Sequence, residues 1–243
     1  MPRTYPTKRI AALQLPSKPR YQENLEILLD RLAALDDVDV VVVPEVFLTA
    51  YDYEHLSTAA KFAPKALKAI KQACGDRIVV LTLLIEEGGV FYNQAVVIHN
   101  GKIVHRQEKV KLFKLGDEDK YLAAGKARRI KPFTIDGVTY AILICFELRF
   151  KELWKQIEGA DIVFVPARWG LPRKRHLEIL SDALAVMNQC YVAVANSSDA
   201  DMAASSAIID PNGEAVRDDA SDTIVTDADM KEVATMRRYI VLD

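Results

Sequence analysis

Cysteine is scarce in this sequence, and no two cysteines lie close together. Of 243 residues only three are cysteine, namely Cys74, Cys145 and Cys190. An odd number of thiols with no CxxC pair excludes a disulfide framework and a thiolate metal cluster. We therefore expect reduced thiols and a cytoplasmic protein.

Long hydrophobic runs and an excess of positive charge are also missing. The longest apolar runs, at residues 40–43 and 140–146, are far shorter than the roughly 18 residues of a membrane span. The apolar stretch 10–15 is interrupted by Gln14 and is too short for the core of a signal peptide. With 32 Lys plus Arg against 34 Asp plus Glu, the chain lacks the basic surplus that nucleic-acid binding needs. We expect neither a membrane nor a nucleic acid as partner.

Glycine and proline number only ten each and are scattered singly or in pairs. No glycine-rich phosphate loop is present, which argues against a nucleotide cofactor. The four histidines and the acidic residues show no recognised metal-ligand spacing, so we expect no metal and no cofactor. Because no linker, repeat or low-complexity tract interrupts the chain, we predict one domain over residues 1–243.

Short β-branched runs recur along the chain and predict buried strands. Half of the residues are hydrophobic, enough for a sizeable core. Strands are predicted at residues 9–15, 38–43, 77–85, 90–99, 102–106, 138–144, 160–165 and 191–195. Helical spacing of leucines predicts helices around residues 25–32, 67–70 and 177–184, and a last helix at 230–237. Tight turns at 87–89 and 100–101 leave no room for a helix, so the sheets must be mixed.

Glu45 follows a run of four valines and Pro44. A carboxylate directly after a buried strand is either a solvated turn residue or an acid placed at the edge of a sheet, where α/β proteins hold working groups. Both readings are open on this motif alone.

Cys145 ends a fully apolar strand and precedes a charged segment that can form a helix. Such an elbow presents a nucleophile well, and the backbone N–H groups that follow are expected to lower the thiol pKa. The alternative is a small buried hydrophobic residue. A dyad with a histidine base is a weaker possibility, for which His176 is the least poor candidate.

Lys109 and Lys111 alternate with Val110 and Leu112, which predicts a strand with one basic face. The alternative interpretation is a solvated lysine edge that protects a strand from aggregation.

Taken together, these motifs resemble those of the nitrilase superfamily of carbon–nitrogen hydrolases. Residues 44–51 (Pro-Glu-Val-Phe-Leu-Thr-Ala-Tyr) are similar to its acid motif, 109–113 (Lys-Val-Lys-Leu-Phe) to its lysine motif, and 145–153 (Cys-Phe-Glu-Leu-Arg-Phe-Lys-Glu-Leu) to its nucleophile motif. Further landmarks that look like the family's are found at 159–161, 166–169, 188–192 and 206–213. The resemblance therefore covers most of the chain.

The resemblance implies an α/β fold, a four-layer αββα sandwich of two mixed sheets with helices outside, which usually forms a homodimer or a larger homo-oligomer. It also implies a cofactor-free hydrolase of a small amide, ω-amide, N-carbamoyl compound or nitrile. In that reading Glu45 is the base, Cys145 the nucleophile, and Lys109 the group that stabilises the oxyanion. Glu118, seven residues before Gly125, stands where many members keep a second glutamate.

Six residues near these motifs are expected around a small-molecule substrate. They are Tyr51, Phe113, Phe146, Glu147, Arg168 and Trp169. Arg168 would favour a carboxylate on the substrate and Glu147 an amine, and the sequence does not decide between them. Leu184 and Met187 replace a charged pair found in many relatives. This departure keeps open an alternative, a catalytically silent protein of the same fold that binds a ligand or partner.

Overall fold

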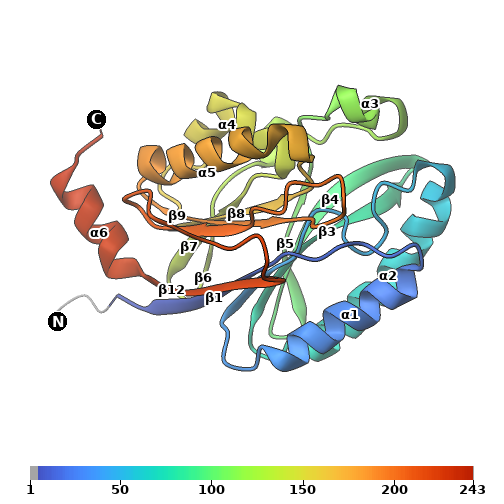
Figure 1. Cartoon of the computed structure of the whole chain (residues 1–243), viewed down its shortest axis with the longest axis horizontal. Coiled ribbons are helices and arrows are strands. Elements are labelled where there is room, and N and C mark those ends of the chain that lie inside the picture. Colours follow the sequence, from blue (N-terminus) through green and yellow to red (C-terminus); the bar gives the residue numbers. More distant parts are fainter. Residues whose placement is uncertain (1–4, 243) are drawn as a thin grey trace.

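Two mixed six-stranded sheets lie face to face between two layers of helices in the computed structural model, which describes residues 5–242 (Figure 1). Helices α1 (Tyr21–Ala34) and α2 (Leu56–Ala73) cover the outer face of one sheet. Helices α4 (Lys151–Gln156) and α5 (Lys174–Asn188) cover the other. This arrangement confirms the predicted αββα sandwich.

The first sheet has the strand order β12-β1-β2-β3-β4-β5. Strands β1, β2 and β3 run parallel, whereas β12, β4 and β5 are joined through antiparallel pairs. The strands are β1 (Thr7–Leu13), β2 (Val40–Val42), β3 (Ile78–Glu87), β4 (Val90–His99), β5 (Lys102–Glu108) and β12 (Thr223–Asp229). The hairpins on either side of β4 are those that the tight turns predicted.

The second sheet has the order β11-β10-β9-β8-β7-β6, with β7, β8 and β9 parallel and the outer pairs antiparallel. Its strands are β6 (Phe133–Ile135), β7 (Val138–Ile142), β8 (Ile162–Ala167), β9 (Tyr191–Asn196), β10 (Ala207–Ile209) and β11 (Ala215–Arg217). The remaining helices are α3 (Glu118–Tyr121) and α6 (Met230–Tyr239), and α6 lies at the end of the molecule where β1 begins (Figure 1).

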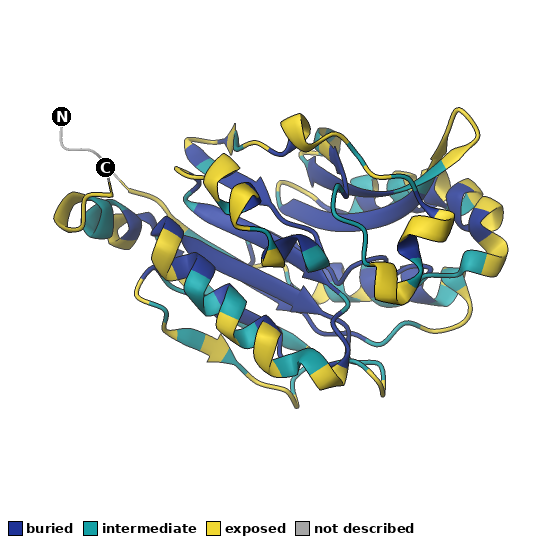
Figure 2. Cartoon of the chain, turned by 90° about the horizontal axis from the view of Figure 1, so that it is seen from above, coloured by how far each residue is buried: buried dark blue, intermediate teal, exposed yellow. Residues whose placement is uncertain are grey.

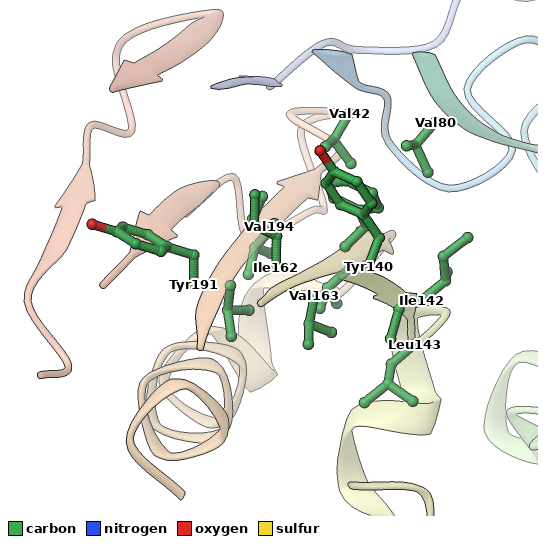
Figure 3. Close-up of a cluster of buried hydrophobic side chains, with 14 of the residues drawn as sticks. Val42, Val80, Tyr140, Ile142, Leu143, Ile162, Val163, Tyr191 and Val194 are labelled. Carbon is green, nitrogen blue, oxygen red and sulfur yellow. The ribbon is translucent and has the colours of Figure 1, made fainter. Parts of the chain in front are cut away.

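Burial on both faces explains why the central strand β2 of the first sheet is apolar throughout. In β2, Val40 and Val42 face the second sheet, whereas Val41 packs with α1 and α2. Figure 3 shows Val42 and Val80 pointing toward Tyr140, which comes from β7 of the facing sheet. Figure 2 shows the central strands almost entirely in the colour of buried residues, whereas the exposed residues gather on the helices, the loops and the strand ends. One continuous core therefore joins both sheets.

The strand predictions were right for the central strands and wrong at two places. Residues 109–113 are not a strand, because β5 ends at Glu108 and the chain then turns away from the sheet. The edge strands β6 and β12 were not predicted, since β6 is only three residues long and β12 carries threonine and aspartate at partly exposed positions. Within residues 5–242, no helix is both long enough and apolar enough to cross a bilayer.

Candidate active site

Parallel strand ends bring the three predicted motifs to one edge of the sandwich. Glu45 comes three residues after β2, Lys109 directly after β5, and Cys145 three residues after β7. Strands β2 and β5 point the same way within the first sheet, and the backbone N–H of Glu45 donates to the carbonyl of Ala167 at the end of β8 (3.2 Å). Such carboxyl ends of strands are where open α/β sheets place ligand sites.

Glu45 and Lys109 form a fully buried ion pair with a Nζ to Oε1 distance of 2.7 Å. The same Oε1 accepts hydrogen bonds from the Tyr51 hydroxyl (2.6 Å) and from Asn93 Nδ2 (2.9 Å). Burial, followed by the charge of Glu45, raises the pKa of Tyr51 well above its usual value, so this hydroxyl is a neutral donor. Three donors thus hold one oxygen of Glu45.

The other oxygen of Glu45, Oε2, is buried and has no hydrogen-bond partner among the residues that the structure describes. Buried carboxylate oxygens are normally satisfied, so this oxygen is an exception. It is available to accept a proton.

Lys109 bridges two carboxylates, because its Nζ also donates to Glu118 Oε1 at 2.7 Å. Burial alone would lower the pKa of Lys109, but the charge of Glu45, together with Glu118, outweighs it and raises the pKa above the usual value. Burial has the opposite effect on a carboxylic acid, and it raises the pKa of Glu118. The structure thus brings Glu118, whose assignment depended on spacing alone, to the ammonium group.

The loop that carries Glu118 is held in position by a close approach between the backbone at Gly125 and the end of β5. Gly125 donates its N–H to the carbonyl of Lys109 (2.8 Å), and a Cβ on Gly125 would lie 2.6 Å from the Cβ of Glu108. Only glycine fits there, so the loop that carries Glu118 returns tightly to the end of β5.

Cys145 begins a one-turn 3₁₀ helix, Cys145–Arg149, with φ of +50°, which is uncommon for a residue other than glycine. Its side chain is accessible only to a small extent, at 7%. The expectation of a lowered thiol pKa is wrong: burial, followed by the negative charge of Glu45, raises the pKa of Cys145 well above its usual value. A single helical turn is too short to offset that desolvation. The resting group is therefore a thiol.

A small pocket opens onto Cys145. Four of the predicted substrate-binding residues line it, namely Phe113, Phe146, Arg168 and Trp169, together with Arg149 and Arg173, which the sequence analysis did not identify. Tyr51 lies in the Glu45 network and lines a neighbouring groove that also reaches Arg168.

Glu147 does not line this pocket, contrary to the expectation that it would face the substrate. Its carboxylate is fully buried and accepts the backbone N–H groups of Val110 (2.6 Å) and Ile144 (2.7 Å). It therefore ties the segment after Lys109 to the segment before Cys145. Burial raises its pKa to about 7.

Asn93 is the residue of the Glu45 network that the sequence analysis missed. It is fully buried in β4 and donates both to Glu45 and to the Tyr51 hydroxyl (3.0 Å). An asparagine at a predicted strand position was the available signal, because a buried amide needs polar partners.

Two further residues singled out from the sequence lie outside this network. His176 is exposed, and its Nδ1 accepts a hydrogen bond from the guanidinium of Arg149 (2.8 Å). Leu184 is fully buried in the core and Met187 is exposed on α5. Across residues 5–242, no group of three or more His, Cys, Asp or Glu side chains is arranged to hold a metal ion.

Comparisons with known proteins identify the same family as the sequence motifs. The profile of the carbon–nitrogen hydrolase family matches residues 9–238. The chain is 34% identical over 215 residues to a 2-oxoglutaramate amidase of Bacillus subtilis strain 168, which covers 83% of this chain and 82% of that protein. It is 30% identical over 224 residues to the omega-amidase YafV of Escherichia coli K12, covering 89% and 86%. A CN-hydrolase superfamily protein of Xanthomonas campestris has the same fold, with a TM-score of 0.85 at 20% identity over 97% of this chain and 95% of its own.

Proposed function

Since this chain belongs to the carbon–nitrogen hydrolase family, we propose that it hydrolyses a small primary amide through a thioester on Cys145 and releases ammonia. The observation that carries this proposal is the difference between the two carboxylate oxygens of Glu45. Three donors hold Oε1, whereas the buried Oε2 has no hydrogen-bond partner among the described residues. Relatives named as amidases of 2-oxoglutaramate and of ω-amides support an amide as the substrate.

In the first half of the reaction, Glu45 Oε2 takes the proton of Cys145, and the sulfur attacks the amide carbon. A base is required because the pKa of this thiol is raised. The C–N bond of the tetrahedral intermediate then breaks, and Glu45 returns the proton to the leaving nitrogen as ammonia departs. In the second half, Glu45 deprotonates a water that attacks the thioester, which frees the carboxylic acid and the thiol.

Lys109 and the backbone N–H of Phe146 stabilise the oxyanion in this scheme. All three N–H bonds of Lys109 are in use, toward Glu45, Glu118 and Tyr51. The contact with the Tyr51 hydroxyl is the longest, at 3.1 Å, and is the one that an oxyanion would displace. Loss of one such donor typically reduces the rate about 100- to 1,000-fold.

Substitution tests this proposal by the ammonia released from a panel of amides, ω-amides, N-carbamoyl compounds and nitriles. Cys145→Ala, Glu45→Gln and Lys109→Ala are each expected to abolish release, whereas His176→Ala retains most of it. Intact-protein mass spectrometry of the wild-type protein, quenched in acid during turnover, should detect the acyl group on the protein, and Cys145→Ala should not carry it. No ammonia and no adduct with any compound would indicate a silent binding protein, and loss of activity in His176→Ala would indicate a Cys–His mechanism.

We further propose that the protein acts in the cytoplasm as a homodimer. Its three cysteines are free and buried, which suits a reducing compartment. The apolar outer face of α5 is available for self-association.

A further inference from the structure

Within residues 5–242 the two sheets are separate backbone ladders, and each contributes part of the proposed catalytic site. Lys109 follows β5, the edge strand of the first sheet next to β4. Cys145 and the backbone N–H of Phe146 follow β7 of the second sheet. Since Lys109 and this N–H are the two proposed oxyanion donors, the reaction depends on how far apart the two strand ends are held.

Glu147 makes one connection between these strand ends. Its Oε1 accepts the backbone N–H of Val110 at 2.6 Å, and its Oε2 accepts that of Ile144 at 2.7 Å. Val110 directly follows Lys109 in the chain. Ile144 directly precedes Cys145. Because the side chain of Glu147 is fully buried, water does not compete for either contact.

Gln107 makes a second connection from its place on β5, two residues before Lys109. Its Nε2 donates to the backbone carbonyl of Ile142, at the end of β7, with a distance of 3.1 Å. Gln107 is also fully buried. The contacts of Gln107 and Glu147 thus lie on the two sides of Lys109, and both reach the short segment that precedes Cys145.

Folding stability alone does not explain these two buried polar side chains. The Oε1 of Gln107 has no hydrogen-bond partner among the described residues, and an unsatisfied buried acceptor destabilises the folded state. Burial raises the pKa of Glu147 to about 7, so its ionised form is disfavoured at this position. Apolar side chains of similar size would fill the same space without either penalty. Both residues therefore indicate a requirement for position.

We propose that Gln107 and Glu147 are positioning residues, which together form an inter-sheet clasp that sets the distance between Lys109 and the turn at Cys145. Each holds backbone close to a proposed catalytic residue, and neither lines the pocket. An oxyanion must lie within about 3 Å of both of its donors, so a small change in the distance between the strand ends separates it from one of them. This inference rests on the proposed amide hydrolysis and adds what holds the two halves of the site in register.

Ammonia release from two probes, butyramide and succinamate, tests the clasp. Glu147→Gln places an amide NH₂ group against a backbone N–H and so breaks one of its two contacts, and kcat is expected to fall about 10- to 100-fold for both probes. Gln107→Leu breaks the other connection and should lower kcat about tenfold. KM is expected to stay within about threefold in both variants, because the contacts that bind the substrate are unchanged.

Thermal unfolding separates a positioning role from loss of the fold. Gln107→Leu is expected to keep the wild-type unfolding temperature, because leucine removes the unpartnered amide oxygen together with one hydrogen bond. Asp161→Asn is the matched control. Asp161 also accepts a backbone N–H, from Thr139 at 2.9 Å, and pairs with Arg237, but at the opposite ends of β7 and β8 from the site. This variant should be less stable and retain the wild-type kcat when folded.

Unchanged kcat in both clasp variants, or an effect on KM alone, would overturn the inference. Crystal structures separate it from the proposed function, since they require no turnover. In Gln107→Leu, the distance from Lys109 Nζ to Cys145 Sγ is expected to differ from that of the wild type by more than about 0.5 Å, the tolerance of a catalytic arrangement. Such a change, without ammonia from any amide with the wild type, would support the clasp and contradict the hydrolase. Ammonia release with kcat and this distance unchanged in both variants would do the reverse.

Discussion

The two oxygens of Glu45 have different surroundings, and this asymmetry explains how one residue can be both fixed and reactive. Lys109, Tyr51 and Asn93 hold Oε1, so the carboxylate cannot rotate away. The free Oε2 provides the site for a proton. Burial and the negative charge of Glu45 destabilise a thiolate at Cys145, so the proposed nucleophile keeps its proton until the proposed base accepts it.

Glu45→Gln should therefore lower the pKa of the Cys145 thiol while abolishing turnover. Glutamine removes the negative charge that, after burial, raises this pKa, and Lys109 then favours the thiolate, so we expect the pKa of the thiol to fall. The rate of alkylation by iodoacetamide between pH 7 and 10 measures the midpoint, with Cys145→Ala as background because Cys74 and Cys190 are fully buried. Glu118→Gln should give a smaller shift, and an equal or higher midpoint in Glu45→Gln would contradict the assignment.

At the scale of elements, Glu147 joins the segment that follows β5 to the turn that follows β7. Its two oxygens accept N–H groups from Val110 and Ile144, which lie beside Lys109 and Cys145 in the chain. Each sheet contributes one side of the site, and one buried carboxylate holds the two sides together. Gly125 holds the third segment, which carries Glu118, against β5.

The pKa of Glu147, raised by burial to about 7 from its unfolded value of 4.5, predicts a pH-dependent stability. Between these two values the folded state holds more protons than the unfolded state, so the contribution of Glu147 is present below pH 4.5 and is lost as the pH rises through about 7. Relative to Glu147→Gln, the wild-type free energy of unfolding should fall by about 3 kcal/mol from pH 4.5 to pH 8. Urea denaturation at several pH values measures this, with the exposed Glu158→Gln as control. Parallel pH profiles for wild type and Glu147→Gln would be contrary to this expectation.

At the scale of the whole molecule, α5 has apolar residues on its outer face as well as on its inner one. Leu177 and Leu184 are buried against the sheet, whereas Ile179, Val186 and Met187 are 47%, 47% and 61% exposed. This stripe of exposed apolar side chains is the surface that we propose for self-association. A single domain over residues 1–243 stays a prediction, supported by the core that continues through both sheets.

We expect the protein to sediment as a dimer and the double substitution Ile179→Glu with Met187→Glu to convert it to a monomer, because two charges would be buried in the interface. Analytical ultracentrifugation measures the mass. Val104→Glu is the control, since Val104 is equally apolar and 46% exposed but lies on β5, the edge strand of the other sheet. A wild-type monomer, or a dimer that survives the double substitution, would rule out this interface.

The central strands, the mixed sheets and the positions of Glu45, Lys109 and Cys145 were determined by the sequence itself. Local patterns specify these features, because burial on both faces of a sheet requires apolar runs such as residues 40–43 and because strand ends place the next polar side chain at the sheet edge. Lys109 shows the limit of such patterns: alternation with Val110 predicted a strand, but contacts with Glu45 and Glu118 hold the segment elsewhere.

Only the tertiary structure decided which polar groups meet. Asn93 donates a hydrogen bond to Glu45, 48 positions away in the chain. The carboxylate of Glu147 accepts the backbone N–H of Val110, 37 positions away, and does not face the pocket. Likewise Asp199 forms an ion pair with Arg168, whereas Arg149 and Arg173 line the pocket and have no ion-pair partner within residues 5–242. Charge compensation and hydrogen bonding depend on distance in space, and a residue's spatial neighbours are set by how the sheets pack, which no local pattern contains.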